Sequence, residues 1–141
     1  MVELVVAIAV TGIIVVFLST AIYQIINVSE YGNNRLTALH ELQNTAHWFN
    51  LDSQEARTAT GGSQLVLTLA DNSTISYSLV GTELRRASGG SQMTLARNIT
   101  SASFAINNRI VTMFLNSSPV GRSNVSENGT YMVSLRPAEG G

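Results

Sequence analysis

The first twenty-six residues, Met1–Ile26 (MVELVVAIAVTGIIVVFLSTAIYQII), decide the fold of this chain. After Glu3, twenty-three consecutive residues carry no charge and are rich in Val, Ile, Leu and Ala. As a helix that rises about 1.5 Å per residue, this run would extend roughly 34 Å, enough to cross a hydrocarbon core of about 30 Å. The run therefore predicts a membrane-spanning helix over residues 1–26.

A signal peptide is another segment that contains an apolar run near the N-terminus. It would carry positive charge before its apolar core and a small-residue cleavage site after it. In this chain the first basic residue is Arg35, and no A-x-A pattern closes the run. We therefore expect the apolar segment to be retained in the mature protein.

Residues Met1–Ile14 (MVELVVAIAVTGII) resemble the N-terminal motif of type IV pilins and type II secretion pseudopilins, F-T-L-x-E-L-x-x-x-I-A-I-x-G-I. Glu3 and Gly12 stand at the spacing of that motif. Because the family's Glu is fifth in the mature chain, the resemblance implies that two mature residues precede Met1. It also implies an α+β fold, in which the second half of one long helix packs on a small antiparallel sheet.

The resemblance gives Glu3 and Gly12 a role in assembly. In the family, the matching Glu pairs with the free or methylated N-terminal amine of a neighbouring subunit. A carboxylate in an apolar bundle does need a cation, although a residue at the membrane boundary can instead reach the headgroups. Gly12 weakens a helix by about 1 kcal/mol relative to Ala, and it either permits close helix approach or unwinding, or is simply tolerated.

The composition of the remaining chain limits the other classes of function. Beyond Ile26, eight Arg balance eight Asp or Glu, and the chain contains no Lys and no Cys. A neutral head argues against nucleic-acid binding, which needs clustered basic residues. The absence of Cys excludes a disulfide and a thiolate metal site. We divide the chain into an apolar helix at 1–26 and one head domain at 27–141.

Helical periodicity continues beyond the apolar run. A stripe of residues spaced three or four apart predicts an amphipathic helix that packs on a sheet. Its members are Leu36, Leu39, Leu42, Ala46, Phe49, Ser53 and Ala56. We expect one helix from Met1 to about Thr60, with Gly61-Gly62 as its stop and with Gly12 and Gly32 as its weak points.

After the glycines the period changes to two, which predicts an antiparallel sheet. Asn107-Asn108 is expected to form a two-residue hairpin turn, and residues 116–128 a loop. The predicted strands are Gln64–Leu69, Thr74–Val80, Glu83–Ala87, Gln92–Ala96, Ile99–Ile106, Arg109–Leu115 and Gly129–Arg136. Their order and turn placement also resemble the head of larger minor pilins and J-type pseudopilins.

Candidate catalytic and metal-binding residues form no motif. His40 and His47 lie seven residues apart, which is not the i, i+4 spacing of a helical zinc pair, and no G-x-S-x-G or phosphate-binding glycine loop occurs. Arg85 and Arg86, if they lie in a strand, point to opposite faces and cannot form one basic patch with Arg97 and Arg109. We expect no enzyme activity and no cofactor.

Six N-x-[ST] sequons occur, where composition predicts about two and a half. They are candidate glycosylation sites if the head lies outside the cell, although an Asn- and Ser/Thr-rich extracellular protein would also raise their number. Their asparagines are Asn27, Asn72, Asn98, Asn116, Asn124 and Asn128.

These features predict a structural subunit of a type IV pilus-like filament that polymerises with itself through its N-terminal helix. We expect it to wait in the cytoplasmic membrane as a single-pass protein, to contact the pilus or secretion assembly machinery there, and then to enter an extracellular filament. Two alternatives stay open. One is a minor pseudopilin that initiates a secretion or DNA-uptake pseudopilus, and the other is a monomeric membrane-anchored binding module.

Overall fold

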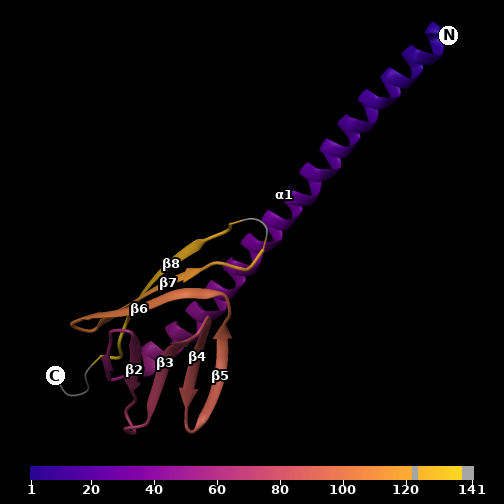
Figure 1. Cartoon of the computed structure of the whole chain (residues 1–141). Coiled ribbons are helices and arrows are strands. Elements are labelled where there is room, and N and C mark those ends of the chain that lie inside the picture. The colour runs from indigo at the N-terminus through magenta and orange to yellow at the C-terminus, as the bar shows by residue number, and fades with distance from the viewer. Residues whose placement is uncertain (122–123, 138–141) are drawn as a thin grey trace.

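The computed structural model describes residues 1–121 and 124–137, which form one long helix followed by eight strands (Figure 1). The predicted α+β fold is confirmed. The helix is α1 (Val2–Glu55), and the strands are β1 (Thr58–Thr60), β2 (Gln64–Thr68), β3 (Thr74–Val80), β4 (Glu83–Ser88), β5 (Ser91–Ala96), β6 (Ile99–Asn107), β7 (Ile110–Ser117) and β8 (Glu127–Ser134).

Helix α1 runs without a break through 54 residues, or about 81 Å at 1.5 Å per residue. Gly12 and Gly32 both lie inside it, and its first half projects away from the strands (Figure 1). Its buried residues all come from the second half: Ala38, Leu42, Thr45, Phe49, Asp52 and Ser53.

The packing face of α1 differs from the predicted stripe at its start. Leu36 was expected to contact the sheet, but it is exposed, and Ala38 is buried in its place. Residues two apart on a helix lie on nearly opposite sides, so a face centred on Ala38 and Leu42 excludes Leu36. Leu42, Phe49, Ser53 and Ala56 are buried as predicted, and Leu39 and Ala46 are half-buried.

The prediction that the helix continues to about Thr60 is wrong, because it ends at Glu55. Ala56 is extended (φ −75°, ψ 141°) and fully buried, and the Arg57 N–H donates to Thr68 O at 2.8 Å. Pairing with β2 thus replaces the next helical turn, and β-branched Thr58 and Thr60 suit the short strand β1 that results.

The strands form two antiparallel sheets, where one was expected. The first has the order β1-β2-β3-β4-β5 and the second the order β6-β7-β8. They meet at Gly62, whose N–H donates to Phe104 O at 2.8 Å and whose carbonyl accepts from the Phe104 N–H at 2.9 Å. A Cβ at Gly61 would lie 2.6 Å from Phe104 O. The glycine pair therefore permits close approach of the two sheets and is not the helix stop that we predicted.

Both sheets share one hydrophobic core with the second half of α1. The helix contacts β5, β7 and β8, and β6 contacts β2, β3 and β4. The largest fully buried side chains include Tyr77, Phe49, Leu65, Leu67, Leu84 and Ile99. A two-residue hairpin turn does connect β6 and β7, but its residues are Asn108 and Arg109 and not the predicted Asn107 and Asn108, because Asn107 still pairs with Ile110 in the ladder. Asn108 takes the positive φ of 55° that the turn requires. Residues 122–123 of the predicted loop lie outside the described part.

Candidate functional site

The first half of α1 presents an uncovered apolar surface. Every residue from Met1 to Ile26 is exposed, and α1 is one helix that is long and apolar enough to cross a membrane by length and composition. An apolar surface of this extent marks contact with lipid or with another protein. The N-terminal helix therefore suggests membrane insertion or export.

Glu3 and Gly12 both lie on this free half. Glu3 is in the first turn of α1, and within residues 1–121 and 124–137 its carboxylate has no recorded partner. A Cβ built on Gly12 would meet nothing within 4 Å. Neither residue contacts another element in residues 1–121 and 124–137, so an assembly role for them would involve another molecule.

The first contacts between the head and α1, counted from the N-terminus, lie near residue 30. Arg35 Nε lies 3.0 Å from Glu127 Oε1 at the start of β8, and the backbone of Gly121 sits against the side chains of Glu30 and Asn34. Residues 1–26, which precede these contacts, are all exposed and are therefore free to meet other molecules.

A buried polar cluster, which the sequence analysis did not identify, joins the last turns of α1 to the first sheet. Arg86 donates to Asp52 from Nε (2.6 Å to Oδ2) and Nη2 (2.8 Å to Oδ1), and the Tyr77 hydroxyl donates to Asp52 Oδ2. The guanidinium also lies 4.9 Å from the centroid of the Trp48 ring. Burial and the neighbouring Asp52 raise the pKa of Tyr77, and the hydrogen bond to Asp52 raises the pKa of Arg86.

The sequence did carry a signal for this cluster. Asp52 continues the buried spacing Leu42, Thr45, Phe49, so it places a carboxylate on the face of α1 that packs. A buried carboxylate requires a charged or hydrogen-bonding partner from the sheet. Arg86 is the basic residue that meets this requirement.

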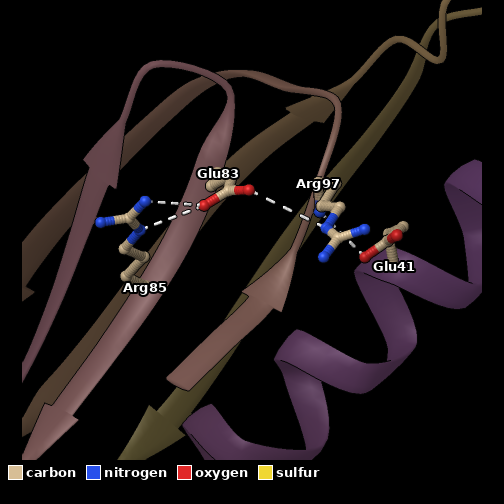
Figure 2. Close-up of polar contacts among 4 residues, drawn as sticks. All are labelled: Glu41, Glu83, Arg85 and Arg97. Atoms are coloured by element: carbon tan, nitrogen blue, oxygen red, sulfur yellow. Dashed lines mark hydrogen bonds and ion pairs between the residues drawn. The ribbon is translucent and has the colours of Figure 1, made fainter. Parts of the chain in front are cut away.

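A second polar group lies at the rim of the first sheet, where β4 and β5 approach α1 (Figure 2). Glu83 Oε2 accepts from Arg85 Nε at 3.1 Å and Nη2 at 2.9 Å, and Glu83 Oε1 lies 3.9 Å from Arg97 Nε. Glu41 Oε2 accepts from the backbone N–H of Arg97 at 3.0 Å. One turn along α1, Asn44 Nδ2 donates to Leu95 O at 2.6 Å. These contacts fix the end of β5 on the helix.

Arg85, Arg86, Arg97 and Arg109 do not form one basic patch: Arg85 and Arg97 lie on either side of Glu83, and the other two lie elsewhere. Arg85 bonds to Glu83 whereas Arg86 bonds to Asp52 beneath the sheet, as the alternation of a strand predicts. Arg109 is also separate: its Nε and Nη2 are buried without a hydrogen-bond partner in the described residues.

The two histidines both lie on the surface of α1. His40 and His47 are exposed on α1, and the His47 ring contacts Trp48 edge-on, with 6.2 Å between centroids. Within the described ranges, no group of three or more His, Cys, Asp or Glu could hold a metal ion.

Four of the six sequons converge on one end of the second sheet. Asn98 precedes β6, Asn116 is the last but one residue of β7 and lies opposite Asn128 on β8, and Asn124 lies just before β8. The Asn116 Oδ1 accepts hydrogen bonds from Thr100 Oγ1 (3.1 Å) and Ser126 Oγ (2.9 Å), which belong to two of the other sequons. Asn72 is exposed at the turn between β2 and β3, and Asn27 is half-buried on α1.

No family model, curated protein or solved structure matches the chain. The architecture itself is pilin-like, since one long apolar N-terminal helix packs in its second half against antiparallel sheets. This resemblance in architecture suggests a structural protein, and nothing in the described residues indicates a catalytic activity.

Proposed function

We propose that this protein is a subunit of an extracellular filament of the type IV pilus class, which polymerises through residues 1–26 of α1. The observation that carries the proposal is that the apolar half of α1 is wholly exposed while the same helix continues unbroken into the core of the head. A flexible tether would need no such continuity. A rigid helix transmits the position of the apolar segment directly to the head, as a regular polymer requires.

Assembly would move the apolar half from lipid into a bundle of the same segment from other copies. Val, Ile and Leu side chains stay out of water in both places, so the transfer costs little hydrophobic free energy. Contacts between successive copies in one direction do not close on themselves, and they therefore generate a filament.

Glu3 would order this step. A carboxylate without a partner is costly at membrane depth, whereas the α-amino group of a neighbouring copy would supply a cation within the bundle. Gly12 would allow neighbouring helices to approach closely in the same region. The assembly machinery of the membrane is the further partner that this role requires.

The test is to shear filaments from cells that make the protein, image them and identify their main component by intact mass. This chain as the main component supports the proposal. Filaments that lack it, or hold only a trace, contradict a bulk-subunit role and favour the minor pseudopilin.

A variant pair separates polymerisation from simple anchoring. Glu3→Ala should abolish filaments while the protein still accumulates in the membrane, and Glu55→Gln should assemble normally, because Glu55 lies at the far end of α1. Normal assembly of Glu3→Ala would contradict the role of Glu3. If neither variant nor the parent forms filaments while all are displayed, the protein is an anchored binding module.

A further inference from the structure

The outer face of the second sheet carries an uncovered apolar patch. Ile110 and Phe114 on β7 and Met132 on β8 are 47%, 43% and 69% exposed, and the register places Thr112 opposite Met132 between the first two. The only charged residue in β6, β7 or β8 is Glu127, which pairs with Arg35 of α1. The apolar patch is therefore bordered by uncharged polar residues and not by charged ones.

Asn128 lies on this same outer face, four residues before Met132 on β8. Residues 128, 130 and 132 of β8 are exposed while Gly129 between them is buried, so Asn128, Thr130 and Met132 project on one side. At about 3.4 Å per residue, Asn128 and Met132 are roughly 14 Å apart along the strand. Thr130, the hydroxyl residue of the sequon, stands between them.

The asparagines of the other sequons differ from Asn128 in burial, hydrogen bonding or backbone conformation. The Asn116 amide oxygen already accepts from two hydroxyls, and Asn27, Asn98 and Asn116 are all half-buried. Asn72 is exposed, but it occupies a positive-φ turn (66°). Asn124 is also exposed, but it lies in the loop before β8 and not on the strands that carry the patch. Asn128 is exposed on a regular strand beside a surface that lacks cover.

We propose that Asn128 carries an N-linked saccharide and that this saccharide lies over Phe114 and Met132. The donor would be a saccharide linked through a diphosphate to a membrane lipid. The amide nitrogen of Asn128 forms a bond to the anomeric carbon, the bond from that carbon to the diphosphate oxygen breaks, and the lipid diphosphate leaves with the electron pair. The amide proton passes to a base of the transferase.

Two independent observations support this site. The first is the sequon, which supplies an exposed acceptor asparagine. The second is the apolar patch: its side chains would be exposed to water unless another group covers them. The proposal goes beyond the filament role and does not depend on it, since it requires only that the head faces outside the membrane.

The acceptor is tested by intact mass and peptide mapping of protein purified from cells that make it naturally. The Asn128 peptide should carry a saccharide mass that disappears in Asn128→Gln and in Thr130→Ala. Thr130→Ser, which restores the sequon hydroxyl, should recover it, and Asn116→Gln should keep it. An unmodified Asn128 in the parent protein overturns the proposal, as does a modification that survives Thr130→Ala.

The covering role is tested by oxidation of methionine, which follows exposure. Under dilute peroxide, Met132 should be oxidised several-fold faster in Asn128→Gln than in the parent. Met93, 37% exposed on β5 of the other sheet, should oxidise equally in both. Equal rates at Met132 overturn the covering role. The covering role is also overturned if Met132 of Asn128→Gln is oxidised slowly when the variant is in filaments and rapidly when it is not. That result would assign this face to contact with a neighbouring copy.

Discussion

Asp52 on α1 and Arg86 on β4 form a bidentate ion pair, with side chains that are only 6% and 16% exposed. Tyr77 lies directly opposite Arg86 in the register of β3 and β4, and it donates to the same carboxylate. One helical carboxylate therefore holds two adjacent strands. Since a buried charge tolerates few alternative partners, this contact fixes how α1 sits on the first sheet.

Asp52→Ala should destabilise the head strongly. The change leaves the Arg86 guanidinium largely buried without its counter-charge, which costs about 3–5 kcal/mol. Chemical denaturation, followed by the fluorescence of Trp48, would measure the loss. Arg85→Ala is the matched control, because the partly exposed pair of Arg85 with Glu83 should contribute no more than about 1 kcal/mol. Equal losses in the two variants would contradict the structural role of the buried pair.

Tyr77 should make the head sensitive to alkali. Because burial and Asp52 raise the pKa of Tyr77 in the folded state, its contribution to stability is complete below the unfolded pKa of about 10 and falls as the pH rises above it. Denaturation midpoints measured from pH 8 to 11.5 should fall more steeply in the parent than in Tyr77→Phe. The variant should also lose about 1.5–3 kcal/mol at neutral pH, because it lacks a hydrogen bond to a charged group. Parallel pH profiles would refute the assignment.

Local patterns predicted much of this fold. The charge-free run fixed the helix, and alternation with Asn and Gly turns placed seven of the strands to within two residues at each end. The helix end was missed because nothing in Ala56-Arg57 breaks a helix locally. What ends it is the pairing of β1 with β2, which depends on residues six to ten positions further on.

The sequence also could not divide the strands into two sheets. Nothing in the period of β5 or β6 distinguishes a continued ladder from a break, and the division appears only when Gly62 meets Phe104 across 42 residues. The candidate functional residues likewise fall into those that the sequence could identify and those that it could not. A motif was sufficient to select Glu3 and Gly12, but the pairing of Asp52 with Arg86 needed the packed geometry.

Gly61→Ala should weaken the junction of the two sheets. The new Cβ would lie 2.6 Å from the carbonyl oxygen of Phe104, so the backbone must shift, at a cost of about 1–3 kcal/mol. Gly32→Ala is a control with the opposite sign, because its Cβ would meet nothing and the helix gains up to about 1 kcal/mol. Thermal unfolding of the two variants would compare them. A neutral Gly61→Ala would show that the sheets can separate freely at this point.

Glu41→Ala should loosen the end of β5, whereas Arg97→Ala should not. Glu41 accepts from the backbone N–H of Arg97, and a hydrogen bond to a charged group contributes about 1.5–3 kcal/mol when shielded and less at this rim. The Arg97 side chain makes only an exposed contact at 3.9 Å with Glu83, which is worth at most about 1 kcal/mol. Hydrogen exchange at the Arg97 amide should rise in the first variant alone. A rise in both would mean that the side chain of Arg97 holds the strand.

Removal of residues 1–26 should leave a soluble head whose stability changes by no more than about 0.5 kcal/mol, because every side chain in that segment is exposed. The comparison requires denaturant titration of residues 27–141 in water and of the whole chain in detergent. The control is a deeper truncation that removes residues 1–42. It removes the Arg35–Glu127 pair and the buried Ala38 and Leu42, and the loss of a buried Leu alone costs about 2–5 kcal/mol. If the shorter truncation already unfolds the head, the apolar half stabilises it through contacts that the structure does not contain, and the division of α1 into a free half and a packed half fails. If only the deeper truncation does so, the apolar half is available entirely for lipid or for other copies.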